Sequence, residues 1–163
     1  MYLNKLIILC GAPGSGKTTW AKKYCEEHSN TIHVSRDVIR FSLLGNDEYY
    51  FAHEDKVLDT FYTLIAQGLK DGKNVIADAS HLTRKSRYNC ITNIRNKLRT
   101  NNFEYPIEVI YFQPPLNVCY TRNDMRTGRA FVPHSAIERM YLSMSDPKYD
   151  KSYNYEKIIY IRE

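Results

Sequence analysis

The residues best suited to chemistry form one loop near the start of the chain. Glycines there would let the backbone wrap closely around a phosphate and turn N–H groups toward it. Lys17 would place its charge near the β- and γ-phosphates, and the hydroxyl of Thr18 would bind Mg²⁺. The loop matches the pattern G-x-x-x-x-G-K-[ST] at every fixed position and consists of Gly11, Ala12, Pro13, Gly14, Ser15, Gly16, Lys17 and Thr18. This pattern predicts a site for ATP and Mg²⁺, with Thr19 also beside the nucleotide.

The elements on either side of the loop support this interpretation. The apolar residues 6–10 predict a buried strand before it, and residues 19–27 predict a helix after it. Such a helix points its positive N-terminal end at a bound anion. These are the flanks that the motif requires, which disfavours the alternative of a glycine-rich turn without a ligand.

Strand and helix patterns alternate along the rest of the chain. Apolar runs predict strands at residues 3–10, 31–34, 75–77, 107–112 and 157–161. The residues between them predict helices at 17–29, 37–44, 53–71, 83–100, 115–126 and 134–144, with a polar break at 45–47. This alternation predicts an α/β fold, with a parallel sheet of about five strands and helices on both of its faces.

Length and composition restrict the possibilities further. A chain of 163 residues suggests one domain over 1–163, and a net charge of +5 favours a polyanionic partner only weakly. The four cysteines lack the spacing of a zinc site or a disulfide framework, so we expect reduced thiols in a cytoplasmic protein. Neither a signal peptide nor an apolar run of about 20 residues is visible, so no membrane is expected.

Two polar residues follow the second predicted strand, at the sheet edge where ligands bind in such folds. Asp37 and Arg40 are three residues apart and would share one face of a helical turn. Asp37 could accept the proton of an attacking hydroxyl in phosphoryl transfer. Arg40 could grip an anionic part of the acceptor. The structural alternative is an aspartate that caps the helix and pairs with the arginine.

Asp78 follows the third predicted strand and belongs to the same edge. It could be a carboxylate associated with Mg²⁺, face the acceptor, or orient an arginine, and the residues alone leave these roles open. His81, three residues later, is more typical of a loop histidine with a satisfied hydrogen bond than of a catalyst.

Arginines mark two further segments. Arg122 and Arg126 are four residues apart on a predicted helix end, within a segment at about 122–133 that could form a lid over ATP. Such a lid would neutralise charge developing on the γ-phosphate, whereas the alternative is a favourable contact with the helix dipole. A second run, from residue 82 to 103, has six cations and no acid, which suggests either a nucleic-acid track or a solvated helix face.

Four blocks make residues 3–144 resemble the kinase domain of bacteriophage 5′-hydroxyl polynucleotide kinases, within the wider set of P-loop kinases. The blocks are residues 11–20, Arg36-Asp37-x-x-Arg40, Asp78-Ala79-Ser80, and a stretch that joins Arg122-Asn123-x-x-Arg126, Val132-Pro133 and Arg139-Met140-Tyr141-x-Ser143-Met144. The resemblance implies a P-loop kinase-like three-layer sandwich with a small helical lid. It also implies ATP-dependent phosphorylation of 5′-OH ends of RNA or DNA.

The resemblance assigns a role to each matching residue. Lys17 and Thr18 would serve ATP and Mg²⁺, Asp37 would be the general base, and Arg40 would contact the phosphate of the acceptor's terminal nucleotide. Asp78 matches an acidic position that the family needs for activity.

The same resemblance gives the lid its roles and also shows departures. Arg126 would reach the transferring phosphate, and Arg122 would lie against the nucleotide. The third block has Asp-Ala-Ser where the phage enzyme has Asp-Thr-Asn, and the chain lacks the Asp-x-Asp motif of the phage 3′-phosphatase domain. We therefore expect kinase activity without phosphatase activity. A kinase of a nucleoside, sugar or nucleotide-sugar is the main alternative, and a nucleotide-dependent switch without transfer is a third possibility; the oligomeric state is not predicted.

Overall fold

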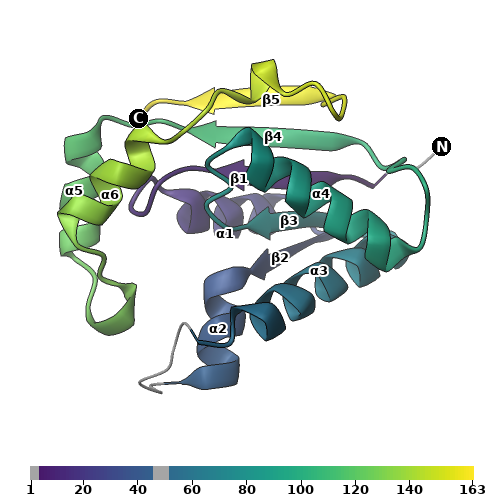
Figure 1. Cartoon of the computed structure of the whole chain (residues 1–163), viewed down its shortest axis with the longest axis horizontal. Helices are drawn as coiled ribbons and strands as arrows, with labels where there is room; N and C mark the ends of the chain where they lie inside the picture. The colour runs from purple at the N-terminus through teal and green to yellow at the C-terminus, as the bar shows by residue number, and fades with distance from the viewer. Residues whose placement is uncertain (1–3, 46–51) are drawn as a thin grey trace.

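The computed structural model describes residues 4–45 and 52–163, and its centre is a five-stranded sheet (Figure 1). The strands are β1 (Leu6–Cys10), β2 (Thr31–Ser35), β3 (Asn74–Asp78), β4 (Ile107–Phe112) and β5 (Lys157–Ile161). They lie in the order β2-β3-β1-β4-β5, and every neighbouring pair is parallel. The predicted α/β fold with a five-stranded parallel sheet is confirmed.

The helices lie within about one turn of their predicted positions. They are α1 (Lys17–Glu27), α2 (Arg36–Leu44), α3 (Glu54–Lys70), α4 (Arg84–Leu98), α5 (Leu116–Asp124) and α6 (His134–Leu142). Two short 3₁₀ turns, Gly128–Ala130 and Pro147–Tyr149, occupy segments that the sequence predicts as loops. Most of the predicted polar break at 45–47 lies outside the described residues.

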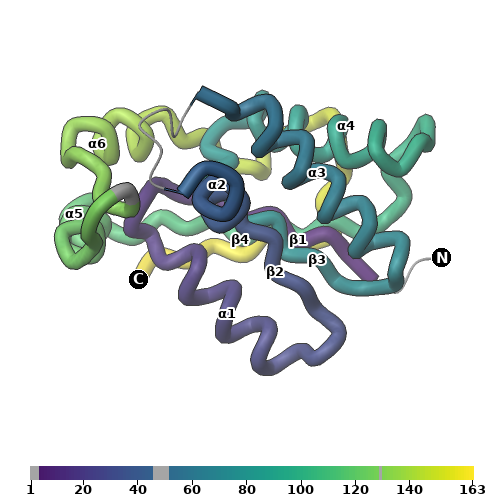
Figure 2. Tube along the Cα trace, turned by 90° about the horizontal axis from the view of Figure 1, so that it is seen from below, coloured from purple at the N-terminus to yellow at the C-terminus, as the bar shows by residue number. Residues whose placement is uncertain are grey.

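The sheet is the middle of three layers. Helix α1 covers one face, while α3 and α4 cover the other (Figure 2). All five residues of β1 are fully buried, because the central strand of a parallel sheet is covered on both sides. The larger core cluster lies under α3 and α4, and a smaller one lies under α1 and includes Ile7, Ile76 and Phe112.

Parallel pairing brings the carboxyl ends of all the strands to one edge. The loop from β1 to α1 begins there, α2 starts directly after β2, and Asp78 is the last residue of β3. Helices α5 and α6 stand at the same end of the molecule (Figure 1). Among the described residues no helix is both long and apolar enough to cross a bilayer.

Candidate active site

The loop between β1 and α1 has the backbone that a phosphate cradle needs. Gly14 and Gly16 have φ values of 80° and 100°, in the region that favours glycine. A Cβ on Gly14 would lie 2.4 Å from the carbonyl oxygen of Cys119, so α5 packs too closely for a side chain there. The backbone N–H of Gly11 donates to the Ser80 carbonyl at 2.9 Å, which ties this loop to the end of β3.

Lys17 lies within this loop rather than extending into solvent. Its Nζ donates to the carbonyl oxygens of Gly11 at 2.7 Å and Ala12 at 3.1 Å. Burial lowers the pKa of the Lys17 ammonium, although the carboxylates of Asp78 and Asp37 act in the opposite direction. The charges of these two carboxylates therefore reach the lysine, as the predicted clustering at the sheet edge requires.

Two neighbouring features show that the loop can accept an anion. Arg122 of α5 lies over it, and its Nη1 donates to the carbonyl oxygen of Ser15 at 3.1 Å. The hydroxyl oxygen of Ser15 is buried and has no hydrogen-bond partner among the described residues. An unpaired buried polar atom costs about 1–3 kcal/mol, and a ligand in the loop would remove that cost.

Asp78 faces the first turn of α1. Its Oδ2 accepts hydrogen bonds from the Thr18 hydroxyl at 3.0 Å and from Nε2 of His33 at 2.7 Å. Burial would raise the pKa of Asp78, but the His33 hydrogen bond and the Lys17 charge outweigh burial and hold it below its usual range. Asp78 is therefore a carboxylate directly beside the hydroxyl of Thr18.

This pair suits Mg²⁺ in the manner of phosphate-transferring enzymes. A hydroxyl and a carboxylate are hard oxygen ligands, and Mg²⁺ in such sites uses one or two protein groups together with substrate phosphates. In the described parts of the chain no group of three or more His, Cys, Asp or Glu residues could hold a metal by itself. Of the three roles considered for Asp78, this geometry favours the association with Mg²⁺.

His33 is a site residue that the sequence did not reveal. The parallel register aligns Ser35 with Asp78 and His33 with Ile76. His33 is therefore two residues before the partner of Asp78, and its imidazole lies on the same face of the sheet as the Asp78 carboxylate. The contact between His33 and Asp78 spans 45 residues of sequence. Only the strand register brings the two together, so no local pattern could predict it.

Asp37 lies on the first turn of α2 and is almost fully exposed. Arg40 donates from Nη1 to Oδ1 of Asp37 at 2.6 Å, and its Nε and Nη2 donate to the two carboxylate oxygens of Glu54 at 2.6 and 2.9 Å. The Asp37 side chain is 89% exposed, whereas that of Arg40 is 7% exposed. Ser35 caps the helix by accepting from the Val38 N–H at 3.3 Å, so Asp37 is not the cap.

The segment after α5 carries Arg126 near the same edge. Arg126 is exposed and lies one turn after Arg122, whose guanidinium donates to the Ser15 carbonyl in the phosphate loop. The side-chain amide of buried Asn123 donates to the Val132 carbonyl oxygen at 2.6 Å and accepts from the Val132 N–H at 2.9 Å. These two hydrogen bonds close the predicted lid segment into a loop. The structure thus brings Lys17, Asp37, Asp78 and Arg126 to one edge.

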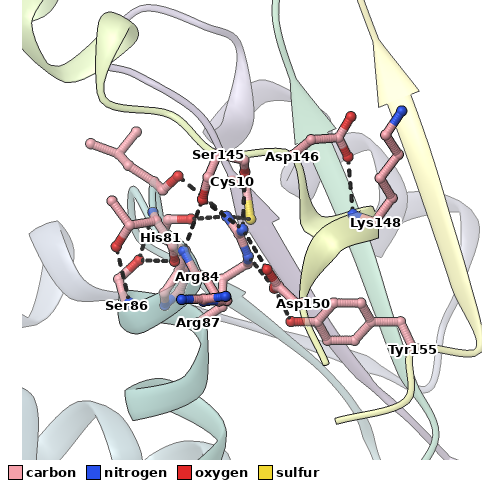
Figure 3. Close-up of polar contacts among 12 residues, drawn as sticks. Cys10, His81, Arg84, Ser86, Arg87, Ser145, Asp146, Lys148, Asp150 and Tyr155 are labelled. Carbon is pink, nitrogen blue, oxygen red and sulfur yellow. Dashed lines mark hydrogen bonds and ion pairs between the residues drawn. The ribbon is translucent and has the colours of Figure 1, made fainter. Parts of the chain in front are cut away.

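The basic run of α4 is much less available than its composition suggests. Arg87 is completely buried, and its Nε and Nη2 donate to the Asp150 carboxylate at 2.7 and 3.0 Å (Figure 3). Lys97 forms an ion pair with Asp59. Arg84 and Lys85 remain exposed at the start of the helix. A continuous cationic track along α4 is therefore absent from the described structure.

The Arg87 contacts join three segments behind the site (Figure 3). Its Nη1 donates to the carbonyl oxygens of His81 and Leu82 at 3.1 and 3.2 Å, and its Nη2 donates to that of Ser145 at 2.9 Å. Nδ1 of His81 donates to the Leu9 carbonyl at 2.9 Å, and burial lowers the His81 pKa to about 4. His81 is thus a neutral structural histidine.

The sequence is similar to that of a curated kinase. The chain is 31% identical to the L-seryl-tRNA(Sec) kinase of Methanococcus maripaludis over 146 residues, which cover 87% of this chain and 53% of that protein. The chain therefore spans about half the length of this curated relative.

Two solved structures are similar to this chain in fold. A chain in the Pnkp1/Rnl/Hen1 RNA repair complex superposes with a TM-score of 0.72 at 29% identity, over 88% of this chain and 44% of that one. A gluconokinase from Sinorhizobium meliloti 1021 shares the fold, with a TM-score of 0.59 at 17% identity over 99% and 84% of the two chains.

The names of these proteins refer to a seryl-tRNA kinase, an RNA repair complex and a gluconokinase, so they indicate different substrates. The family model described as the AAA domain matches residues 6–147, which include the phosphate loop, both carboxylates and the lid arginines. This protein belongs to the family described as the AAA domain.

Proposed function

We propose that this chain transfers the γ-phosphate of ATP to the 5′-hydroxyl end of RNA or DNA, with Asp37 as the general base. The observation that carries the proposal is the position of the Asp37 carboxylate. It is exposed to an incoming acceptor, it lies on the first turn of α2 at the sheet edge where the phosphate loop begins, and Arg40 pairs with it.

The phosphate loop prepares the donor. When ATP binds, Nζ of Lys17 exchanges the carbonyl oxygens of Gly11 and Ala12 for the β- and γ-phosphates. Thr18 and Asp78 would hold Mg²⁺, which supplies positive charge to the phosphates when it is bound. His33 keeps the Asp78 carboxylate directed at Thr18.

Asp37 then acts on the acceptor. Its carboxylate accepts the proton of the 5′-hydroxyl while the new oxygen–phosphorus bond forms and the bond to ADP breaks. As Asp37 turns to the hydroxyl, the Arg40 guanidinium, which also binds Glu54, contacts the phosphate of the acceptor's terminal nucleotide. Arg126 and Arg122 offset the charge on the transferring phosphate.

Sequence and similarity support this acceptor over others. The four blocks shared with phage-type polynucleotide kinases include both Asp37 with Arg40 and the lid arginines. The name of one similar structure refers to an RNA repair complex, and a similar protein is named a seryl-tRNA kinase. The four cysteines are free, as expected of a protein in the reducing cytoplasm, where we place this activity.

A small-molecule kinase is the second candidate, and one observation favours it. Arg87 and Lys97 are engaged with Asp150 and Asp59, so the cations of α4 cannot all serve a long polyanion. The carboxylate of Asp37 and the phosphate loop would serve the hydroxyl of a nucleoside or sugar equally well. The two candidates differ only in the acceptor.

Transfer from γ-labelled ATP in Mg²⁺ distinguishes them. The acceptors are a 5′-OH RNA oligonucleotide, its DNA equivalent, a 3′-nucleotide, and a panel of nucleosides and sugars, with Lys17→Ala as the control for a contaminating kinase. We expect label on the oligonucleotides and no release of phosphate from a 3′-phosphorylated RNA. Label on a small molecule alone would reject the polynucleotide acceptor while keeping the catalytic roles.

A further inference from the structure

A cavity of about 520 Å³ lies away from the phosphate loop, beside the C-terminal half of α4. The loop from α4 to β4 and the segment before β5 form its other walls. Among the described residues no carboxylate lines it. Its side chains include Arg95, the rings of Tyr88, Phe103 and Tyr153, and the amides of Asn101, Asn102 and Asn154. Its composition combines one cation, flat rings and hydrogen-bonding amides.

A much smaller pocket shares Tyr88, Ser152 and Tyr153 with this cavity and extends it along α4 to Arg84. Arg84 is the first residue of α4, six positions after Asp78, so this end of the pocket lies toward the edge that carries the phosphate loop. The only acid that lines the extension, Asp150, already accepts from Arg87 and from the Tyr155 hydroxyl. We call the cavity and its extension the α4 groove.

Arg95 supplies the evidence for an anionic ligand. Its Nε is buried and has no hydrogen-bond partner in the described parts of the chain, and no carboxylate there pairs with its guanidinium. Arg87 and Lys97 on the same helix both have such partners. A buried donor without a partner is costly, and a phosphate oxygen is a strong acceptor for a guanidinium.

The rings supply the evidence for bases. Tyr88 is 43% exposed, and its ring lies 5.8 Å from that of Tyr153 at an angle of 36°. A hydrogen bond of 2.9 Å between the Tyr153 and Thr92 hydroxyls fixes the second ring. Single-stranded nucleic acids bind by stacking bases on such rings, and asparagine amides can contact base edges.

We propose that the α4 groove binds the single strand of the acceptor that leads away from its 5′ end. The proposal rests on the proposed function and extends its acceptor site, with a backbone phosphate at Arg95 and bases on Tyr88 and Tyr153. Arg95 lies 11 residues after Arg84 in α4, about 16 Å along the helix, so it meets a nucleotide well removed from the reacting hydroxyl. Contacts at that distance make binding depend on acceptor length.

Binding is measured first, without ATP, by the anisotropy of a labelled single-stranded 5′-OH RNA of about 16 nucleotides over a range of salt concentrations. We expect Arg95→Gln to weaken binding and to reduce the slope of log K against log salt by about 0.7, the share of one phosphate contact. Tyr88→Ala should weaken binding about tenfold through lost stacking. Lys97→Gln is the matched control on the same helix, and it should change the affinity by less than about twofold.

Transfer is then compared on acceptors of different length. For Arg95→Gln and Tyr88→Ala, kcat/KM should fall at least about tenfold more on the long RNA than on a dinucleotide. Equal losses on both acceptors, or wild-type affinity in both variants, would overturn the α4 groove. Thermal unfolding tests whether each variant is folded. If Arg95→Gln does not fold, the Tyr88→Ala variant, at an exposed position, tests the α4 groove on its own.

The two proposals fail in different ways. If wild-type protein phosphorylates the long RNA and both variants match it, the polynucleotide function stands and the groove is rejected. If no oligonucleotide is phosphorylated but the RNA binds and the variants weaken it, the groove stands and the function is rejected. If the wild-type protein does not bind the RNA at all, the groove is rejected whatever the kinase assay shows.

Discussion

Two buried arginines in this protein each grip a carboxylate with two N–H groups, and the carboxylates around them differ in exposure. Arg40 joins Asp37 and Glu54 at the open edge of the sheet, and Arg87 joins Asp150 inside the molecule. The Asp37 side chain is 89% exposed, while that of Asp150 is 5% exposed. The chemistry is the same, so exposure decides what each cluster can do.

Exposure sets the energetic cost of opening the contact. Water competes for an exposed ion pair, which therefore contributes little to stability and can exchange one partner for a substrate. When a buried ion pair loses one partner, the other charge stays in the protein interior without compensation, which strongly lowers stability. We therefore assign Asp37 and Arg40 to catalysis and Arg87 and Asp150 to the architecture that supports it.

The largest expected effect is that of Asp37→Asn on transfer. The amide cannot accept the proton of the acceptor, so kcat should fall by about 10⁴-fold, while the affinity for ATP and the free energy of unfolding stay nearly constant. Rapid-quench transfer, nucleotide titration and urea unfolding measure the three quantities. A large loss of ATP affinity would instead connect Asp37 with Mg²⁺.

Arg87→Met tests the buried cluster in the opposite sense. Removing the guanidinium leaves Asp150 buried without its cation, which should lower the free energy of unfolding by about 3–5 kcal/mol. Urea unfolding measures the loss, and Arg84→Met, at an exposed position three residues earlier, is the control. A loss below about 1 kcal/mol would show that Asp150 finds other partners and that the two clusters are more alike than proposed.

Arg126 offers a third arginine for the comparison, exposed and without an ion pair in the described residues. Arg126→Ala should lower kcat about a hundredfold and change KM for ATP little, because its contact tightens in the transition state. Steady-state kinetics at saturating acceptor separate the two constants. A rise in KM with unchanged kcat would place Arg126 in ground-state binding.

The smallest expected effect, counted per pH unit, is a change in stability that comes from His81, next to Arg87. Its pKa is about 4 in the fold and 6.5 when unfolded, so the unfolded chain binds the extra proton between these values. Stability should therefore fall by about 1.4 kcal/mol per unit as the pH drops from 6.5 toward 4, and the contribution levels off below.

Unfolding in urea across this pH range, for wild type and His81→Asn, isolates the contribution of His81. Asparagine tolerates the positive φ of 42° at this position. The difference in stability between the two proteins should change with pH. A constant difference would show that folding does not shift the pKa of His81.

Local patterns predicted most of the site. The phosphate loop, Asp37 with Arg40, and Asp78 are each defined by spacing or by a position after a strand, and parallel pairing gathers them at one edge. Their assigned roles in transfer stay predictions. The contact between His33 and Asp78 could not be predicted, because it depends on strand register.

The burial of Arg87 could have been predicted from its spacing to apolar residues of α4, but its charge suggested an exposed position. Cys90, Ile91 and Ile94 follow it at intervals of three, four and seven residues, so Arg87 occupies the buried stripe of α4. Within a run of cations it suggested nucleic-acid binding or a solvated face. Its partner Asp150 lies 63 residues away, and only the tertiary fold reveals that pairing.

The contacts behind the site have a consequence for amide exchange with solvent deuterium. Hydrogen bonds run from Gly11 to Ser80, from His81 to Leu9 and from Arg87 to His81, so the start of the phosphate loop and the start of α4 are held in one cooperative unit. Their amides should exchange only in openings that also release Asp150. The exposed turn of α2 around Asp37 should exchange orders of magnitude sooner, which lets the base reorient while the cradle stays closed.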